Sequence, residues 1–243
     1  MSNHENKLVR HQEYFFRDGD ITIRVEDSLF RFHKYFLTRE SKHFHGMLIP
    51  NAIPCRDPPG SSETNPIVLK DATTEGFASL LWVFYNPEYS IYKAPLEKWK
   101  HILKLAQQWG FAQVEKLCIR ELENLSIPPV EKIELYQEFK INQSLLHSSY
   151  VALTTRPEPL DVKEGNKLGL DTSLTIARAR ELARARDHGF LGATEVRSII
   201  EDVFGLGSGP PPSTTPPQTQ NQNSTTNDHA DKGGKNRNKN NKS

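Results

Sequence analysis

The chain has 243 residues, a formal net charge of +1 and two cysteines, Cys55 and Cys118. This length allows one large domain or two small ones, and so few cysteines argue against a disulfide framework and for a reducing compartment. No apolar run approaches the ~20 residues that a transmembrane helix needs, and the first residues lack the apolar stretch of a secretory signal. We therefore expect a cytoplasmic or nuclear protein that does not cross a membrane.

The first predicted elements form a β-hairpin. Residues 21–26 alternate apolar and polar side chains, and residues 29–33 alternate again. This is the period of half-buried strands. A tight turn at Asp27 and Ser28 is expected to join the two strands.

Two short helices and a further strand are expected next. Large apolar side chains recur at helical spacing between residues 36 and 48, where Thr38 or Ser41 can cap a second helical piece. Five prolines in residues 50–66 predict a loop, and residues 66–71 predict a short strand.

Three amphipathic helices follow. Thr73 or Thr74 can start the first, which Asn86 and Pro87 stop. The second closes at Gly110, and the third reaches about residue 125. Because their apolar residues recur every three or four positions, we interpret these stripes as core rather than as a cofactor site.

A smaller helical region is predicted over residues 126–206. Asp161 and Glu164 have the spacing of a capping box, and Asp171 is expected to cap the helix after it. Residues 194–205 place their large apolar groups on one helical face.

The end of the chain differs from the rest in composition. Residues 207–243 are rich in Pro, Ser, Thr, Asn and Gln, and Ala230 is their only hydrophobic residue. Nothing in this tail can offset the entropy of ordering it, so we predict disorder. Five Lys/Arg against two Asp give the tail a net +3 and leave about −2 for the rest of the chain. That remainder has no electrostatic footprint for nucleic acid.

Three histidines, His33, His43 and His45, lie within thirteen positions and raise the question of a metal or catalytic site. His43 and His45 are two apart on a predicted helix, so they point about 200° apart and cannot chelate one ion. His33 ends a strand and is interpreted as a buried or half-buried histidine that hydrogen-bonds to backbone. The sequence contains no zinc-ligand spacing, nucleophile motif or phosphate-binding loop, so we expect no catalytic residue, no cofactor and no metal.

Four arginines, at positions 178, 180, 184 and 186, form the densest basic feature. Arg180 and Arg184 share a helical face, with acidic residues interspersed. A solvated helix face is favoured over a phosphate-binding strip. The basic end of the tail is interpreted as a solubilising segment, with weak RNA contact or a role in localisation as alternatives.

The first half of the chain carries, in order, residues that resemble the BTB/POZ domain. Asp20 precedes the first strand, His33–Lys34 leads out of the hairpin, and "SKHFHGM" follows with a Ser-x-x-Phe-x-x-Met spacing. "IVLKDATTEGFASLLWVFYN" and "ILKLAQQWGFAQVEKLCIRELE" resemble the later strand and helices of that domain. The resemblance covers residues 14–125 and implies an α+β fold, in which a small β-sheet is flanked by an α-helical cluster.

Stretches outside this core resemble a group of fungal BTB proteins, among them "EYFFRDGD", "ELENLSIPPVEKIELYQ" and "LTTRPEPLDVKEGNKLGL". The C-terminal helices of that group loosely resemble the BACK region of other BTB proteins. The expected division of the chain is an N-terminal extension (1–13), a BTB/POZ domain (14–125), a C-terminal helical region (126–206) and a disordered tail with a basic end (207–243).

The resemblance implies a protein-interaction module that commonly homodimerises. In other members an Asp and a basic residue form a charged pocket at the dimer interface, and Asp20 and Lys34 stand at these positions, with Lys in place of the more usual Arg. The apolar residues before the hairpin and along the first helices either fill the core of the chain itself or, as the resemblance favours, complete that interface. The expected interface residues are Tyr14, Phe15, Phe16, Asp20, Lys34, Phe36, Leu37, Phe44, Met47 and Leu48.

Three functions remain open from the sequence. The leading one is a non-catalytic, homodimeric scaffold for an unidentified protein partner. The second is a substrate adaptor of a cullin ubiquitin ligase, although "NPEYS" lacks a clean hydrophobic-x-acidic signal after the preceding helix. The third is a regulator that contacts nucleic acid weakly through the basic tail.

The composition of the tail yields a first prediction. Deleting residues 207–243 should leave the melting temperature nearly unchanged, because the segment has almost no apolar group to bury. Differential scanning calorimetry of the full and truncated chains measures this. A fall of more than a few degrees on truncation would show that the tail packs on the rest of the protein.

Overall fold

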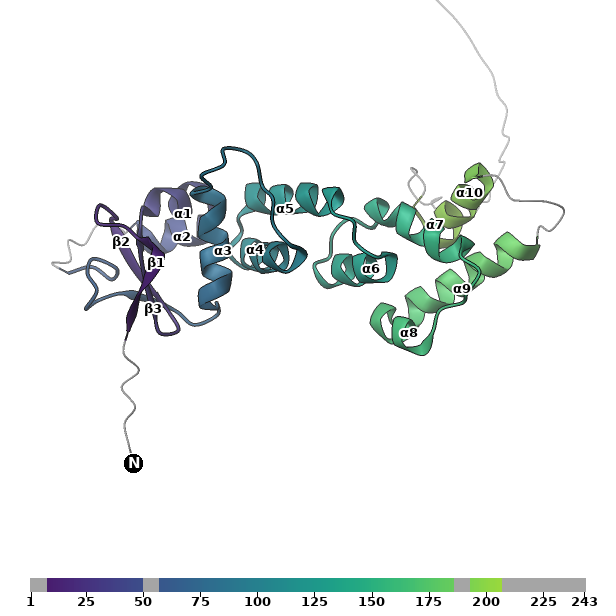
Figure 1. Cartoon of the computed structure of the whole chain (residues 1–243), viewed down its shortest axis with the longest axis horizontal. Helices are drawn as coiled ribbons and strands as arrows, with labels where there is room; N and C mark the ends of the chain where they lie inside the picture. Colours follow the sequence, from purple (N-terminus) through teal and green to yellow (C-terminus); the bar gives the residue numbers. More distant parts are fainter. Residues whose placement is uncertain (1–7, 50–56, 186–192, 207–243) are drawn as a thin grey trace, which may run out of the picture. The chain divides into compact units, whose positions relative to one another are not determined.

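The structure is a computed structural model that describes residues 8–49, 57–185 and 193–206 (Figure 1). These residues belong to one compact unit. The tail predicted to be disordered, residues 207–243, lies outside the described residues.

The described residues form a small sheet and a series of helices. In chain order the elements are β1 Val9–Phe15, β2 Ile21–Val25, β3 Ser28–Phe32, α1 Lys34–Glu40, α2 Lys42–Leu48, β4 Ile67–Leu69, α3 Thr74–Phe84, α4 Leu96–Trp109, α5 Ala112–Asn124, α6 Pro129–Glu138, η1 Gln143–Leu146, α7 His147–Thr155, α8 Val162–Leu168, α9 Leu170–Ala185 and α10 Ala193–Phe204.

The sheet has the strand order β1-β3-β2-β4. The predicted hairpin is confirmed, since β2 and β3 pair antiparallel from Ile21 opposite Phe32 to Val25 opposite Ser28. Because Ser28 already pairs, the turn falls at Glu26 and Asp27, one residue earlier than expected. Glu26 has a left-handed φ of 53°.

The first strand was not predicted. β1 pairs parallel with β3, and it includes Tyr14 and Phe15, which the sequence placed before the first strand. Most side chains of β1 are exposed and only Tyr14 is buried. An edge strand of this kind shows little apolar alternation, so the sequence pattern did not reveal it.

The inner face of the hairpin packs against α3. Phe30 and Phe32 are fully buried, and their rings meet Phe77 edge to face at centroid distances of 5.0 and 5.8 Å. Ser41, between α1 and α2, caps α2, because its Oγ accepts from the Phe44 backbone N–H at 3.2 Å. The same hydroxyl donates to the Trp109 carbonyl at 2.5 Å, which attaches α2 to the end of α4. The sequence named Ser41 as a possible cap, and this is confirmed.

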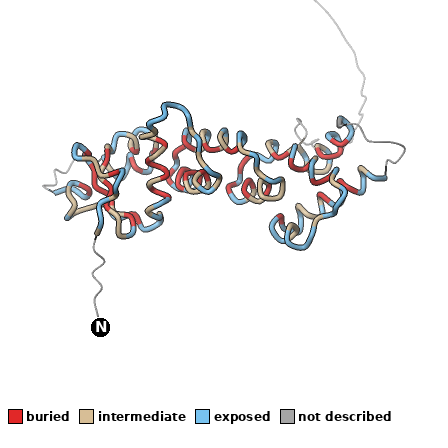
Figure 2. The backbone as a smooth tube through the Cα atoms, viewed as in Figure 1, coloured by how far each residue is buried: buried red, intermediate tan, exposed pale blue. Residues whose placement is uncertain are grey.

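The three amphipathic helices α3, α4 and α5 form as predicted. Thr73 caps α3, since its Oγ1 accepts from the Gly76 backbone N–H at 3.1 Å, and α4 ends at Gly110 in the left-handed region. The apolar stripes of the three helices face one continuous core (Figure 2).

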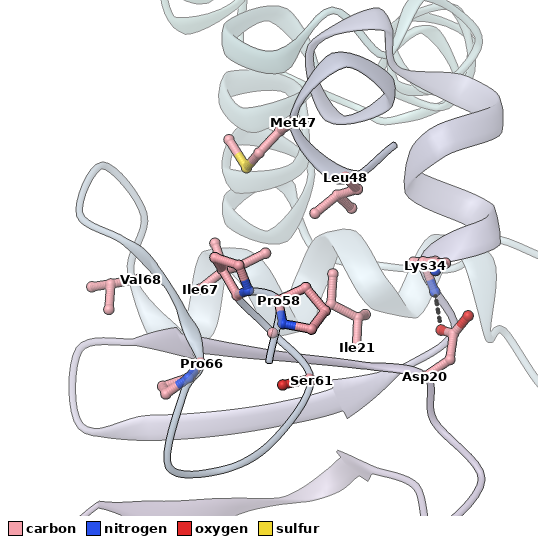
Figure 3. Close-up of a pocket in the computed structure, with 12 residues that line it drawn as sticks. Asp20, Ile21, Lys34, Met47, Leu48, Pro58, Ser61, Pro66, Ile67 and Val68 are labelled. Carbon is pink, nitrogen blue, oxygen red and sulfur yellow. Dashed lines mark hydrogen bonds between the residues drawn. The ribbon is translucent and has the colours of Figure 1, made fainter. Parts of the chain in front are cut away.

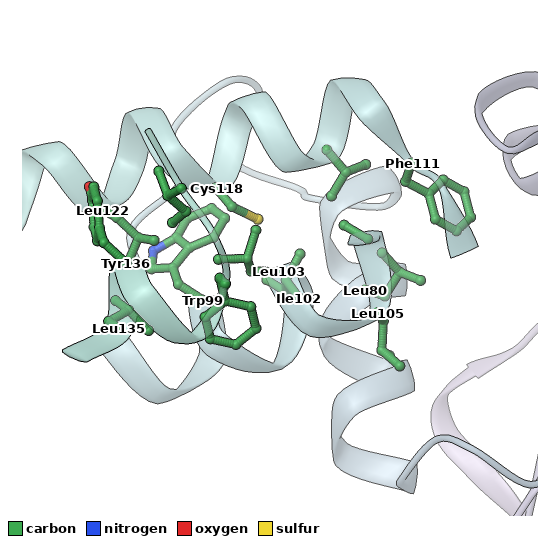
Figure 4. Close-up of a cluster of buried hydrophobic side chains, with 14 of the residues drawn as sticks. Leu80, Trp99, Ile102, Leu103, Leu105, Phe111, Cys118, Leu122, Leu135 and Tyr136 are labelled. Atoms are coloured by element: carbon green, nitrogen blue, oxygen red, sulfur yellow. The ribbon is translucent and has the colours of Figure 1, made fainter. Parts of the chain in front are cut away.

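That core continues into the helices after residue 126. Trp99 of α4 and Leu122 of α5 lie beside Leu135 and Tyr136 of α6 (Figure 4). An ion pair also connects α5 to α6, because the Lys132 ammonium lies 2.9 Å from the Glu123 carboxylate. The helices before residue 126 and those after it therefore share one buried core.

The C-terminal helices confirm one predicted cap and correct another. Asp161 and Glu164 form the expected capping box at the start of α8. Asp171 was expected to cap the following helix, but α9 begins at Leu170, so Asp171 lies inside its first turn. Gly169 has a φ of 79° and lets the chain pass directly from α8 to α9.

Arg180 is not on a solvated face as predicted. It is 4% exposed, and its guanidinium donates to the carbonyl oxygens of Leu153 at 2.6 Å, Arg156 at 2.8 Å and Pro157 at 3.1 Å. These carbonyls lie at and beyond the C-terminal end of α7, where helix carbonyls lack intrahelical partners. Arg180 therefore closes α7 from another helix, a long-range contact that spacing within α9 does not reveal.

A stability prediction follows from this contact. Arg180→Met should lower the free energy of unfolding by about 2–3 kcal/mol, because it leaves several buried carbonyls without a donor. Arg178→Met, at an exposed position of the same helix, should change it by less than about 0.5 kcal/mol. Urea unfolding measures both, and equal effects would contradict the role assigned to Arg180.

Candidate interaction surface

A cavity of about 510 Å³ opens beside the sheet, where β2, β4, the end of α2 and the loop at residues 58–66 come together (Figure 3). Four of the predicted interface residues line it: Asp20, Lys34, Met47 and Leu48. The other lining residues are Ile21, Pro58, Pro59, Gly60, Ser61, Pro66, Ile67 and Val68. The structure thus brings part of the expected interface into one mostly apolar hollow.

The wall of the cavity is fixed by the backbone of Gly60. Its carbonyl accepts from the Thr22 N–H at 2.7 Å, and its N–H donates to the Asn65 carbonyl at 2.7 Å. Gly60 has a φ of 86°, and a Cβ there would lie 3.0 Å from Ile21 and 3.1 Å from Ile67. Glycine is therefore required where this loop crosses the sheet.

Two exposed apolar side chains border the opening. Met47 is 44% exposed and Val68 is 51% exposed. Ile49, one residue beyond α2, is also exposed. Exposed apolar residues that gather around a hollow mark a contact surface more than single ones do.

Asp20 and Lys34 meet at the edge of the cavity, but in a different way from that expected. The Asp20 carboxylate accepts a hydrogen bond from the backbone N–H of Lys34 at 2.7 Å, and the ion pairs found within residues 8–49, 57–185 and 193–206 do not include the Lys34 ammonium with Asp20. The His33 side chain does not cap α1. Asp20 therefore supplies the missing cap of that helix from the start of β2.

The other aromatic residues of the expected interface gather around Tyr85. Phe16 lies 4.9 Å from the Tyr85 ring and Phe36 lies 5.2 Å from it, between centroids. Tyr14 lies 6.2 Å away and is buried, which raises its pKa to about 12. Phe16 and Phe36 keep some exposed surface, so this cluster reaches the outside of the protein.

His33 belongs to the same cluster. Its Nδ1 lies 2.9 Å from the Tyr85 hydroxyl, which also accepts from the His33 backbone N–H at 3.0 Å, and its Nε2 lies 3.5 Å from Asp18. The prediction of a half-buried histidine is confirmed, but the ring contacts side chains rather than backbone.

Three predicted interface residues, Tyr14, Leu37 and Phe44, are buried, and a fourth, Phe15, is partly covered. Leu37 and Phe44 are fully buried in the core of the chain itself, so they have no surface to offer a partner. Phe15 is half-buried, and the Arg10 guanidinium lies 4.9 Å from its ring centroid. Arg10 is held there by a bidentate contact with Glu63.

The sequence analysis missed Ile67 and Val68. Both lie in the short strand β4, which was predicted, but a strand of three residues is too short to show which side faces out. The loop at Pro58 and Gly60 was predicted as a loop without a role. Its place beside β2 depends on long-range hydrogen bonds.

No group of three or more His, Cys, Asp or Glu side chains is placed to hold a metal ion in the part of the chain that the structure describes. Burial raises the pKa of the Cys118 thiol to about 12, so this cysteine is a poor nucleophile. Among the described helices none is long and apolar enough to span a bilayer.

Comparison with known proteins finds a match over the first half of the chain, which contains the cavity and the aromatic cluster around Tyr85. The profile of the BTB/POZ domain matches residues 10–126. Proteins named BTB/POZ domain-containing protein 9 from Bos taurus, Rattus norvegicus and Homo sapiens are each 29% identical over 118 residues. The match covers 47% of this chain and 17% of each relative, so the chain spans only a small part of their length. The predicted fold class, a small sheet with a helical cluster, is confirmed.

The geometry at Asp20 gives a prediction that separates a helix cap from an ion pair. Asp20→Ala should lower the free energy of unfolding by about 1 kcal/mol, because the first N–H of α1 loses its acceptor. Lys34→Met should change it by less than about 0.5 kcal/mol, since the backbone N–H remains. Chemical denaturation measures both, and losses of similar size would favour an ion pair over the cap.

Proposed function

We propose that this chain, whose residues 10–126 match the profile of the BTB/POZ domain, is a homodimeric scaffold for protein–protein interaction without catalytic activity of its own. BTB/POZ domains are interaction modules that commonly self-associate and bind cullins. The observation that carries the proposal is the cavity that Asp20, Lys34, Met47 and Leu48 line together with Val68.

The surface proposed for self-association is narrower than the sequence suggested. It comprises the rim of the cavity, with Met47, Ile49 and Val68, and the exposed edge of the aromatic cluster at Phe16 and Phe36. A fully buried side chain of this size stabilises by ~1.5–3 kcal/mol, and a two-fold axis would bury each of them twice. Several such groups offset the cost of associating two chains.

The proposal also includes a division of the chain into segments and a cellular location. An N-terminal extension (1–13), a BTB/POZ domain (14–125), a loosely BACK-like helical region (126–206) and a tail (207–243) describe the sequence, and stretches outside the domain resemble fungal BTB proteins. The absence of a spanning helix among the described residues supports a cytoplasmic or nuclear location.

A second candidate is an adaptor that presents a substrate to a cullin ubiquitin ligase. It is favoured by a hollow of about 280 Å³ between α1, α3 and α5, lined in part by Phe36, Phe84 and Val114. The loop after α3 contributes Tyr92 to the lining and carries two exposed apolar residues, Tyr89 and Ile91. Binding of purified cullin that Ile91→Asp abolishes and Val68→Asp spares would select this function.

The main proposal predicts a change of mass. In light scattering the parent should have a molar mass of twice the 27.7 kDa of one chain. Met47→Asp or Val68→Asp should lower this mass toward that of one chain, because dimerisation would then desolvate a charge in the interface. Ile91→Asp is the matched control, because Ile91 has the same 51% exposure as Val68 and does not line the cavity. All three variants replace exposed residues, so each should keep its melting temperature within a few degrees. A parent that is folded and has the mass of one chain at high micromolar concentration would contradict the proposal.

A further inference from the structure

A second hollow lies in the C-terminal helices, outside the stretch that the BTB/POZ profile matches. It is a groove of about 400 Å³ between α8 and α9, and its lining includes Val162, Leu174, Ala177, Arg180, Glu181 and Arg184. We propose that the α8–α9 groove binds a short peptide segment of a partner protein that carries large apolar side chains next to an acidic residue.

The floor of the groove is apolar and uncovered. Val162 is 80% exposed and Leu174 is 60% exposed. Figure 2 shows many exposed residues along α8 and α9. The core of the chain takes a different stripe of α9, Ile176 and Ala179. Leu170, Leu174 and Ala177 recur at i, i+4 and i+7, so α9 has a second apolar stripe that the described chain leaves without a partner.

One end of the groove is positively charged. Neither Arg180 nor Arg184 forms an ion pair with a carboxylate among the described residues, and both guanidinium groups donate to the Pro157 carbonyl, at 3.1 and 3.2 Å. Arg180 is more than nine-tenths buried, so its charge is poorly screened by water. A carboxylate beside this pair would gain charge-assisted hydrogen bonds.

The lining has two carboxylates, Asp161 and Glu181, and two guanidinium groups, so its formal charge is zero, but neither carboxylate forms an ion pair with Arg180 or Arg184 among the described residues. The Asp161 carboxylate accepts the backbone N–H of Glu164 at 2.7 Å and is used as a helix cap. Glu181 is exposed and has no ion pair among the described residues. At the arginine end, the lining therefore complements an apolar segment that places a carboxylate there.

The size of the groove favours a peptide over a second copy of the chain. A hollow of about 400 Å³ holds a few side chains, whereas a stable dimer interface buries ~800 Å² on each partner. A second copy would also bring the same unpaired guanidinium groups to a two-fold contact. The α8–α9 groove thus suits an anchored short segment and is separate from the self-association surface proposed above.

The test uses the full chain and a display library of random 12-residue peptides as the probe. The library is selected on the parent and counter-selected on the double variant Leu174→Ser/Arg184→Glu. Peptides enriched on the parent should combine Asp or Glu with at least two large apolar residues. Fluorescence polarisation of the most enriched peptide then measures affinity for single variants.

The single variants separate the groove from the rest of α9. Leu174→Ser and Arg184→Glu should each weaken binding about tenfold or more. Leu182→Ser and Arg178→Glu are the matched controls, since both residues are exposed on α9 and neither lines the groove, and each should change affinity less than about twofold. Replacing the acidic residue of the peptide by Lys should restore binding to Arg184→Glu and weaken binding to the parent.

Three results would overturn the inference: no peptide enriched on the parent over the double variant, enriched peptides without an acidic residue, or controls that weaken binding as much as Leu174→Ser does. Light scattering of the same samples keeps the two proposals apart. A parent that runs as a monomer and still binds the peptide through Leu174 and Arg184 would support the groove and contradict self-association.

Discussion

Burial of helix α4 on more than one side is the constraint on which the rest of the structure depends. Trp99, Ile102, Leu103, Leu105 and Ala106 are all buried, and at 3.6 residues per turn they span about 160° of the helix surface. The helix packs against α3, and through it the sheet, on one side and against α5 on another. Truncating a buried Trp or Leu in such a position costs ~2–5 kcal/mol, so α4 ties the elements around it into one core.

This shared core decides which residues remain for function. The early helices carry more large apolar groups than one side of a short helix holds, and the core takes Leu37 and Phe44 entirely. Met47 and Val68 are not taken up by the core and remain exposed at the rim of the cavity. The proposed contact surface is therefore the set of apolar side chains that the core leaves exposed. The same division holds on α9, where Ile176 is buried and Leu174 is not.

Local periodicity was enough to predict most elements, and its limits have physical causes. The hairpin and helices α3 to α5 are half-buried or amphipathic, so their patterns could be read directly. β1 has no such pattern, because an edge strand with one buried side chain carries almost no alternation. The contact of Asp20 with the Lys34 N–H and that of Arg180 with the α7 carbonyls join distant segments. The family resemblance paired Asp20 with Lys34 but as a charged pocket rather than a helix cap, and spacing within α9 placed Arg180 on a solvated face.

The two proposed surfaces have different chemistry, and their combination has a consequence for binding strength. The cavity beside the sheet is mostly apolar and has no unpaired arginine, which suits a permanent contact between like chains. The α8–α9 groove is small and charged at one end, which suits a weak and exchangeable segment. A homodimer would carry two such grooves held at a fixed separation. A partner with two acidic–apolar segments would then bind the second groove as an intramolecular step, with an effective concentration set by the linker between its segments. Self-association would in this way strengthen the capture of a partner without adding any contact to the groove itself.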